Sequence, residues 1–340
     1  MSEVYRLTEL DNPLKVRELL RKVSGIEKGA LVAVKLHMGE TFTHGFIKPP
    51  FVKEIVTEIK EMGGRPFITD TTTLYPRGRF TAVDYLETAR KNGFDSSAIG
   101  APVIIADGLT GEDGVIVETG GRLVGKIEIG QAIHEADYLV TLTHCTGHIS
   151  VGYGGAIKNL GMGCMTKNGK RTVHGFSMPQ VDKEKCEKCG ACVKVCPYSV
   201  IEMKDFPKID AKRCVGCCRC VSACPTQAMH QPEGWFDDYI RALAEAANSV
   251  VRKFGENACF VNFITDVTAM CDCGVQEEAL IPDIGILASG DILSVDRASY
   301  DLIKEAAGKD ILKEAWNVDG ELQFGIAEEL GMGSKEYEIK

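Results

Sequence analysis

Residues 186–197 read CEKCGACVKVCP, and residues 214–225 read CVGCCRCVSACP. In both stretches two residues separate the first three cysteines from one another, three residues precede the fourth cysteine, and a proline follows it. Nine of the 14 cysteines in the 340 residues fall between Cys186 and Cys224. Disulfide-rich domains are short and secreted, whereas this chain is long and its first residues lack the apolar core of a secretory signal. The clustered thiols therefore predict metal ligation.

The spacing of these cysteines is typical of bacterial two-cluster ferredoxins, in which the fourth cysteine of each run ligates the other cluster. The segment 181–232 resembles these proteins, which implies two 4Fe–4S clusters. The first cluster would be held by Cys186, Cys189, Cys192 and Cys224. The second cluster would be held by Cys214, Cys217, Cys220 and Cys196. A pair of zinc ribbons is the alternative. However, a zinc ion needs only four ligands, and zinc binding does not explain why both runs contain a third cysteine at the same spacing and a fourth cysteine followed by proline.

Composition limits the remaining possibilities. Hydrophobic residues make up 44% and charged residues 26% of the chain, as in globular proteins with a sizeable core. No apolar run approaches the roughly 18 residues of a transmembrane helix. The net charge of -9 and the isoelectric point near 5.4 argue against binding to nucleic acid or an anionic membrane. We therefore expect a cytoplasmic protein with neither partner.

Short apolar runs alternate with amphipathic stretches on both sides of the cysteine-rich segment. Strands are predicted at 31–36, 66–69, 103–106, 138–142, 259–264 and 284–287. Helices are predicted at 13–23, 51–62, 81–92, 235–253 and 295–307. This alternation predicts an α/β fold, a mainly parallel sheet with flanking helices. The predicted organisation is a discontinuous α/β domain over 1–180 and 233–340, interrupted by a small α+β two-cluster ferredoxin-like insert over 181–232.

Polar residues follow the ends of the predicted strands. They are Lys35, His37, Asp70, Asp107 and His144. Open parallel sheets bind ligands beyond the carboxyl ends of their strands, so these side chains are candidates for one site. The alternative is that they are ordinary loop residues or helix caps.

The stretch after the fourth predicted strand is rich in glycine and contains a lysine. Six glycines lie between 147 and 163, and glycines let backbone amides approach a ligand closely. The stretch matches neither a Walker A loop nor a GxGxxG fingerprint. We predict catalytic roles for Lys158, His148 and His144. We predict cofactor binding by Gly154, Gly155, Lys158, Asn159 and Asp70. The alternative is a structural helix–strand connection with a hydrogen-bonded lysine.

Two further phrases carry a family resemblance. GGAIKNLGMG at 154–163 and SGDILSVD at 289–296, with a ferredoxin segment between them, resemble the domain-of-unknown-function 362 family, and CDC at 271–273 fits the same set. The resemblance covers essentially the whole chain and implies the fold of that family, whose chemistry is poorly defined. One departure is that the family's usual Asp-Pro-Val-Ala is DILS at 291–294 here.

One constellation is similar to the cofactor site of nickel-pincer lactate racemases. That site has a histidine, a lysine ten residues later and a histidine sixteen residues beyond the lysine, a spacing that His148, Lys158 and His174 share. The similarity implies that Lys158 contacts a pyridine-type cofactor, that His174 ligates a separate metal ion and that His148 is an acid or base.

The cysteines outside the two ligand sets have weaker signals. Cys218 is expected to be a free thiol or a neighbour of the ligands. Cys271 and Cys273, with Cys145 and Cys164, are candidates for a separate thiolate or metal site, and buried unligated cysteines are the alternative.

The leading hypothesis is an iron–sulfur oxidoreductase. Its clusters would pass single electrons between a ferredoxin-like partner and a cofactor or small-molecule substrate in a glycine-rich cleft near Lys158. A flavin or deazaflavin is a candidate second cofactor, although no fingerprint identifies one. The alternatives are a nickel-pincer racemase or isomerase with structural clusters and a non-enzymatic electron carrier. Exposed low-potential clusters also predict oxygen sensitivity and an anaerobic host. The substrate, cluster potentials and oligomeric state stay open.

Overall fold

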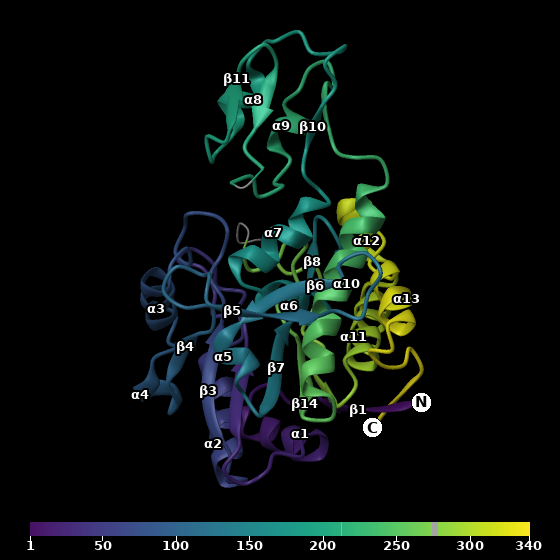
Figure 1. The fold of residues 1–340 in the computed structure, drawn as a ribbon. Helices are drawn as coiled ribbons and strands as arrows, with labels where there is room; N and C mark the ends of the chain where they lie inside the picture. Colours follow the sequence, from purple (N-terminus) through teal and green to yellow (C-terminus); the bar gives the residue numbers. More distant parts are fainter. Residues whose placement is uncertain (212, 274–277) are drawn as a thin grey trace.

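A mostly parallel sheet forms the centre of the protein (Figure 1). The computed structural model describes residues 1–211, 213–273 and 278–340. The eight strands of the central sheet lie in the order β16-β1-β15-β14-β7-β2-β3-β4. In chain order they are β1 (Ser2–Leu7), β2 (Leu31–Lys35), β3 (Arg65–Asp70), β4 (Val103–Ile105), β7 (Tyr138–His144), β14 (Ala258–Ile264), β15 (Gly285–Ser289) and β16 (Tyr337–Ile339). Only β15 is antiparallel to its neighbours, β1 and β14. The predicted α/β fold with a mainly parallel sheet is confirmed.

The helices outside the residues 181–232 cover both faces of this sheet. They are η1 (Pro13–Lys15), α1 (Val16–Val23), α2 (Pro49–Glu61), α3 (Ala82–Lys91), α4 (Ser96–Ile99), α5 (Gln131–His134), α6 (Ala156–Gly163), α7 (Lys167–Gly175), α10 (Trp235–Phe254), α11 (Ile292–Ala307), α12 (Ile311–Trp316) and α13 (Leu322–Glu329). Two small ladders lie beside the sheet: β5 (Gly114–Glu118) with β6 (Lys126–Gly130), and β8 (Thr146–His148) with β9 (Gly152–Gly154).

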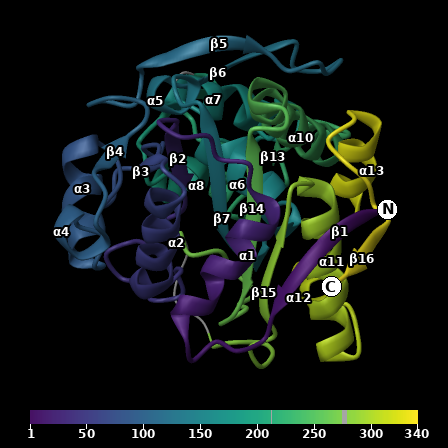
Figure 2. The same cartoon turned by 90° about the horizontal axis from the view of Figure 1, so that it is seen from below.

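Two hydrophobic cores sandwich the sheet because successive strand residues point to opposite faces. In β7, Leu139 packs into the core beneath α6, α10 and α11. Its neighbours Val140 and Leu142 pack into the other core, with α1 and α2. Figure 2 shows the central strands between these two helical layers. The uninterrupted burial of β7 and β14 is what a parallel sheet covered on both faces requires.

Local sequence signals explain where two of the helices start. α2 begins with Pro49, whose missing N–H is not needed at the first helical position. α3 begins after Thr81, which forms a capping box with Asp84. Both starts lie within two residues of the predicted ones.

The sheet edge formed by β1 and β16 was not predicted. β1 pairs in parallel with β16 and antiparallel with β15, so the two ends of the chain lie side by side (Figure 1). Both strands are short and partly exposed, and their apolar pattern is too brief to stand out in the sequence.

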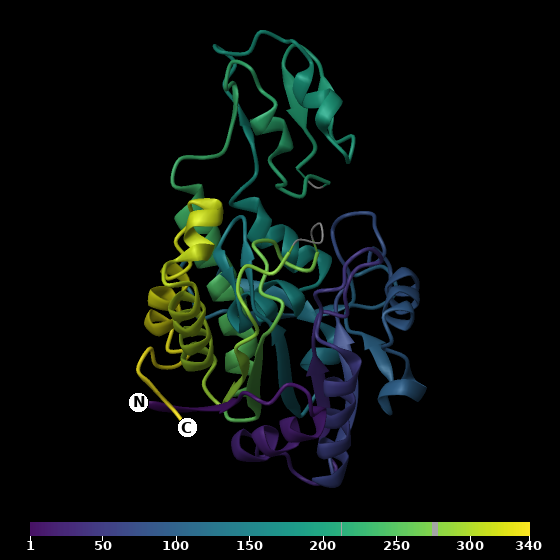
Figure 3. The same ribbon diagram turned by 180° about the vertical axis from the view of Figure 1, so that it is seen from behind.

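The residues 181–232, called the insert below, form a small lobe on the remainder, called the body. β10 (Gln180–Val181) pairs with β13 (Met229–His230) where the lobe joins the body. Between them lie α8 (Ala191–Val195), β11 (Ile201–Met203), β12 (Pro207–Ile209) and α9 (Arg219–Ser222). The lobe has its own hydrophobic cluster around the cysteines. Figures 1 and 3 show the insert standing over the carboxyl ends of β2, β3 and β7.

Among the described helices, none combines the length and apolar character that crossing a membrane demands.

Candidate functional site

The eight cysteines of the two repeated runs line two cavities in the insert. One cavity, of about 290 Å³, is lined by Cys186, Cys189, Cys192 and Cys224. The other, of about 320 Å³, is lined by Cys196, Cys214, Cys217 and Cys220, with Cys218 beside them. Each cavity takes three cysteines from one run and the fourth from the other. The structure therefore brings the cysteines together in the two groups of four named from the spacing.

The same loop conformation occurs in both runs. Lys188 and Gly190 have φ angles of 56° and 75°, and Gly216 and Cys218 have φ angles of 62° and 54°. These left-handed values flank the second cysteine of each run and turn the loop around its cavity. Glycine adopts such angles without strain. When the two runs are aligned, Cys218 stands at the position that Gly190 occupies in the first run.

Burial and backbone amides set the protonation of the sulfurs. Burial raises the pKa of the Cys220 thiol to about 12, and burial also raises the pKa values of Cys192 and Cys214. At Cys224 burial is outweighed, because the Met229 N–H lies 3.3 Å from its Sγ and lowers its pKa. Burial thus keeps most of these sulfurs protonated in the absence of a metal, and a bound metal would favour their thiolate form, so four cysteines in each cavity fit a metal–sulfur group.

A second group of polar side chains lies at the carboxyl ends of β2 and β3. Lys35 and Asp70 form a buried ion pair, with 3.1 Å between Nζ and Oδ1. Asn159 accepts a hydrogen bond from Lys35 and donates one of 3.0 Å to the Leu142 carbonyl. Tyr85 donates its hydroxyl proton to Asp70. Asp70 and Asn159 thus bind neighbouring side chains and hold this edge of the sheet together.

Asp296 of α11 fixes the start of α6. Its carboxylate accepts the N–H groups of Ala156 and Ile157 at 2.7 and 2.8 Å. A Cβ on Gly155 would lie 2.4 Å from Asp296 Oδ1, so this position requires glycine. At Gly154, in β9, a Cβ would find ordinary contacts of 3.4 Å or more. The two sequence phrases of the resemblance, 154–163 and 289–296, therefore meet at this carboxylate.

Lys158, one turn into α6, has no hydrogen bond or ion pair within the described part of the chain. Burial lowers its pKa to about 8, and the cations Lys35 and Arg79 contribute to this shift against the opposing charge of Asp272. Burial also lowers the pKa of Lys170 to about 8. The Lys170 ammonium donates a hydrogen bond of 2.5 Å to the Thr71 hydroxyl. Two lysines at this edge can therefore lose their protons near neutral pH.

The two histidines at and after the end of β7, His144 and His148, differ in their protonation state. His144 lies 2.9 Å from Asp272 and its Nε2 lies 2.6 Å from the Thr265 carbonyl. Burial opposes protonation of His144, but Asp272 and Thr265 raise its pKa above the ordinary value. His148 accepts the Ser150 N–H at 3.1 Å through Nδ1. Burial and the charge of Lys158 lower the pKa of His148 well below its usual range, so this ring is neutral.

His174 is placed in α7, where the body meets the insert. Its ring centroid lies 5.7 Å from that of Tyr239. A Cβ on Gly216 of the insert would lie 3.6 Å from its Nδ1. Burial lowers the pKa of His174 to about 4, with a contribution from Lys170. His174 also contributes to the lowered pKa of His148, so the predicted trio with Lys158 is close enough to interact electrostatically.

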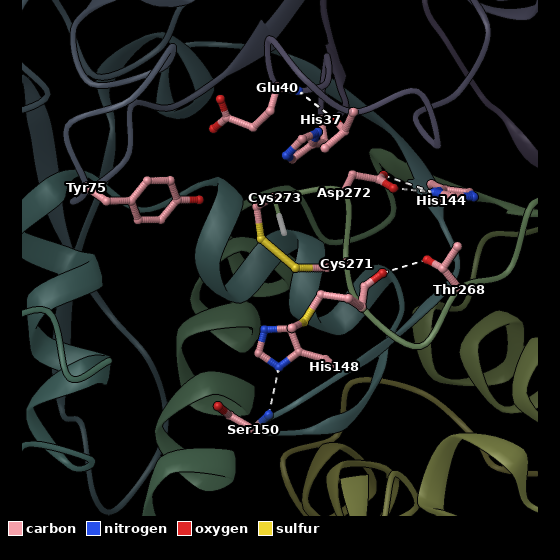
Figure 4. Close-up of a disulfide and its surroundings, with 12 residues drawn as sticks. His37, Glu40, Tyr75, His144, His148, Ser150, Thr268, Cys271, Asp272 and Cys273 are labelled. Atoms are coloured by element: carbon pink, nitrogen blue, oxygen red, sulfur yellow. Dashed lines mark hydrogen bonds and ion pairs between the residues drawn. A yellow bond between two sulfur atoms is a disulfide. The ribbon is translucent and has the colours of Figure 1, made fainter. Parts of the chain in front are cut away.

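Sequence reasoning missed the surroundings of Cys271 and Cys273. These two residues form a disulfide, and Figure 4 shows it between His148, Tyr75, Asp272 and the pair His37 and Glu40. The Cys-x-Cys pattern was the available signal, but the loops after β2 and β3 that bring the neighbours carry no motif.

The structure pairs two of the four cysteines of the predicted separate site. Cys271 and Cys273 pair with each other, whereas Cys145 and Cys164 are buried free thiols. Cys145 accepts a hydrogen bond of 3.2 Å from the Tyr153 hydroxyl. Among residues 1–211, 213–273 and 278–340, no three His, Cys, Asp or Glu side chains are arranged around a single metal ion.

Comparisons with known proteins give one family and several distant structural likenesses. A family model described as "Domain of unknown function (DUF362)" matches residues 32–301. No curated protein matches the chain. The lactate racemase apoprotein from Thermoanaerobacterium thermosaccharolyticum is 13% identical with a TM-score of 0.43, over 90% of this chain and 58% of its own. A protein from Thermotoga maritima is 10% identical with a TM-score of 0.45, over 89% of this chain and 60% of its own.

The chain thus spans less than two thirds of the length of either solved structure.

Proposed function

We propose that this chain, which belongs to the DUF362 family, is an iron–sulfur oxidoreductase. Its insert would hold two 4Fe–4S clusters that exchange single electrons with a ferredoxin-like partner. The body would hold the electron acceptor or donor at the carboxyl edge of the sheet, close to Lys158. We further propose that it works in the reduced environment of the cytoplasm and that oxygen damages it.

One observation carries this proposal: two cavities, each lined by four cysteines contributed three and one by the two runs. A thiolate set of four is the ligand set of a 4Fe–4S cluster, and the exchange of the fourth cysteine is the pattern of two-cluster ferredoxins. A zinc ion also binds four thiolates, but it does so at about 2.3 Å and gives no reason for the exchange.

The residues of the insert have separable tasks. Cys186, Cys189, Cys192 and Cys224 would hold one cluster. Cys196, Cys214, Cys217 and Cys220 would hold the other. When bound, such clusters supply reversible one-electron transfer. The Met229 N–H that points at Cys224 Sγ stabilises negative charge on that sulfur, which favours ligation and reduction.

The residues of the body fit an acidic ligand or a proton-coupled reaction. Lys158 has no partner in the described chain and a pKa of about 8, so it can hold an anion or release a proton near neutral pH. Arg79 is buried, with its Nε 2.7 Å from Glu40 Oε1, and keeps its charge beside Lys158. A small acidic molecule or an organic two-electron cofactor, flavin or deazaflavin, fits this charge pattern.

Anaerobic reconstitution tests the proposal. We expect about eight iron and eight sulfide per chain and a cluster signal in electron paramagnetic resonance after reduction. Cys217→Ser should lose about half of the iron, because one cluster loses a ligand. Cys218→Ser is the matched control, since its neighbouring sulfur belongs to neither group of four, and it should keep all of the iron. Protein that contains zinc without sulfide contradicts the proposal, as does equal iron loss in both variants.

A nickel-pincer racemase or isomerase is a second candidate. It is favoured by the unpartnered Lys158 beside the neutral His148, with His174 in electrostatic range. Expression together with the enzymes that make the pincer cofactor should then give one tightly bound nickel, lost in Lys158→Ala. Nickel-free protein rejects this candidate without affecting the first.

The third candidate is an electron carrier without a reaction of its own. It predicts that cluster reduction and reoxidation by partners are the only activities, and that they are unchanged in Lys158→Ala and His148→Ala. A second redox-active group beyond the clusters would exclude this candidate.

A further inference from the structure

The disulfide between Cys271 and Cys273 lies inside the candidate site of the body. Cys271 is buried, with 8% of its surface exposed. In Figure 4 the His148 ring lies on one side of the two sulfurs, His37 and Glu40 lie on the other, and the Tyr75 hydroxyl points toward Cys273. Polar side chains thus lie on several sides of the two sulfurs.

This disulfide contributes little to the stability of the fold. It joins residues separated by only two positions, and the stabilisation from a cross-link falls as the closed loop shortens. Within the described residues the other twelve cysteines are free thiols, so the chain is not one that relies on disulfides. A bond that stabilises little and lies among titratable groups is better explained by chemistry.

The neighbours of the disulfide include unsatisfied polar atoms. His37 accepts the Gly39 N–H at 2.9 Å through Nδ1, which leaves its buried Nε2 as an N–H donor without a partner. Glu40 is fully buried and its Oε2 has no hydrogen-bond partner either. Unpaired buried donors and acceptors cost free energy, so they indicate a place prepared for a ligand or a proton.

The residue between the two cysteines is held in place. The carboxylate of Asp272 lies 2.9 Å from His144 Nδ1, and His144 Nε2 lies 2.6 Å from the Thr265 carbonyl. Both ring nitrogens of His144 therefore have hydrogen-bond partners, and the ion pair with Asp272 fixes the turn that carries the two sulfurs. This support does not depend on the disulfide, so the turn is held whether the sulfurs are bonded or separated.

Two tyrosines, one in the insert and one in the body, lie in electrostatic range of each other. Tyr198 lines the cavity that contains Cys217. Burial raises the pKa of Tyr198 to about 12, and the neighbouring Cys217 and Tyr75 add to this shift. Tyr75 belongs to the body, and Figure 4 shows it facing Cys273. Tyr75 thus faces the disulfide and lies in electrostatic range of a residue that lines the second cavity.

We propose that Cys271 and Cys273 form a two-electron redox centre that exchanges electrons with the two clusters. This inference rests on the proposed function, which places clusters in the insert. The Cys271–Cys273 disulfide would take up two electrons and two protons from solvent, so that the sulfur–sulfur bond breaks and two thiols form. Clusters held by the insert, when bound and reduced, would supply one electron each.

The proposed role explains why the insert would hold two clusters and not one. Each cluster carries one electron, whereas a disulfide accepts two, so two clusters close to one dithiol can complete the reduction without an external carrier. The substrate that accepts the electrons would then be one that a dithiol can reduce, such as a disulfide or another two-electron oxidant.

Counting electrons tests this inference in the reconstituted full chain. Coulometric titration with a viologen mediator should need about four electrons per chain, one per cluster and two for the disulfide. The double variant Cys271→Ser/Cys273→Ser should need about two. Cys259→Ala is the matched control, because Cys259 is a buried free thiol of β14, and it should still need about four.

Differential alkylation gives an independent readout. Samples are quenched in acid at each potential, free thiols are alkylated, and the peptide with both cysteines is analysed by mass spectrometry. In the reconstituted protein this peptide should change from bonded to doubly alkylated as electrons enter. In Cys217→Ser, followed over time at one potential, the change should be at least about ten-fold slower, because the cluster of the cavity that Tyr198 lines is lost and only the other cluster remains in the insert.

The failures of the two proposals can be told apart. Protein without iron and sulfide overturns the proposed function. Protein with both clusters that needs about two electrons and keeps its cysteines bonded overturns this inference alone. Equal rates of alkylation in the reconstituted protein and in Cys217→Ser would show that the mediator reduces the disulfide directly, which also overturns the inference.

Discussion

At the scale of single residues, the candidate site keeps side chains in states that a folded core would normally avoid. Lys158 is largely buried without a partner, and His37 and Glu40 each keep an unsatisfied atom. Such groups lower the stability of the protein, and their persistence is typical of functional sites. The cost should be measurable when one of these groups is replaced.

Replacing Lys158 by methionine should stabilise the protein. The pKa of Lys158 is lowered from 10.5 to about 8, so the folded state holds this proton less tightly than the unfolded state. Stability is therefore reduced below pH 8 and recovers as pH rises toward 10.5. At pH 7 we expect Lys158→Met to raise the free energy of unfolding by about 2 kcal/mol, with solvent moderating the effect.

Urea unfolding at pH 7 and pH 10 measures this difference, which should shrink at the higher pH. Lys53→Met is the control, because Lys53 is exposed on α2 and should change stability by less than about 0.5 kcal/mol. Destabilisation by Lys158→Met at pH 7 would mean that the lysine has a structural role.

The pair His144 and Asp272 should have the opposite pH dependence. Burial opposes protonation of His144, yet Asp272 raises its pKa above 6.5. The contribution of the pair is therefore complete below pH 6.5 and is lost as pH rises through the folded pKa. Asp272→Asn should cost about 2 kcal/mol at pH 5.5 and less at pH 9.

A double-mutant cycle with His144→Gln isolates this interaction from other effects of the substitution. Chemical unfolding of the four proteins at both pH values provides the numbers. A coupling energy that is the same at pH 5.5 and pH 9 would show that His144 is neutral in the folded protein.

At the scale of elements, α6 is positioned by a carboxylate from another helix. Asp296 accepts two N–H groups at the start of α6 and a hydrogen bond of 2.8 Å from Asn262. The positive end of the α6 dipole adds to this attraction. Lys158 stands one turn further along, so the carboxylate determines where its ammonium lies.

Asp296→Ala should destabilise the protein by about 3 kcal/mol, because it leaves three buried donors unpaired. Asp301→Ala is the matched control on the same helix, since Asp301 forms a partly exposed ion pair with Arg297 that should contribute less than about 1 kcal/mol. Thermal unfolding monitored by circular dichroism compares the two. Similar losses in both variants would contradict the role given to Asp296.

At the scale of the whole molecule, the sequence was most informative where local pattern and final structure coincide. The apolar run of β7 predicted a buried strand because every residue of it is covered. The cysteine spacing named the groups that line each cavity because the loops are local. The surroundings of Cys271 could not be predicted, since Tyr75, His37 and Glu40 arrive on loops after two different strands. The pairing of β1 with β16 depends on residues far apart in the chain.

The contact between insert and body gives the last prediction. Gly216 of the insert has a φ of 62°, and a Cβ there would lie 2.7 Å from Ser177 Oγ and 3.2 Å from the His174 carbonyl oxygen. Gly190 has a φ of 75° at the neighbouring loop of the other run, but a Cβ there would meet nothing within 4 Å. Alanine should therefore strain the backbone at both positions by about 1 kcal/mol, whereas only Gly216→Ala should push the insert away from α7.

Hydrogen exchange distinguishes these effects, because it reports each amide separately. In Gly216→Ala we expect the amides at the end of α7 and at Ser177 to exchange about five-fold faster or more, since they lose the insert that covers them. In Gly190→Ala these amides should exchange as in the unaltered protein, while iron content reports any damage to the cysteine loops in either variant. Equal exchange at α7 in both variants would mean that the insert does not rest on the body through Gly216.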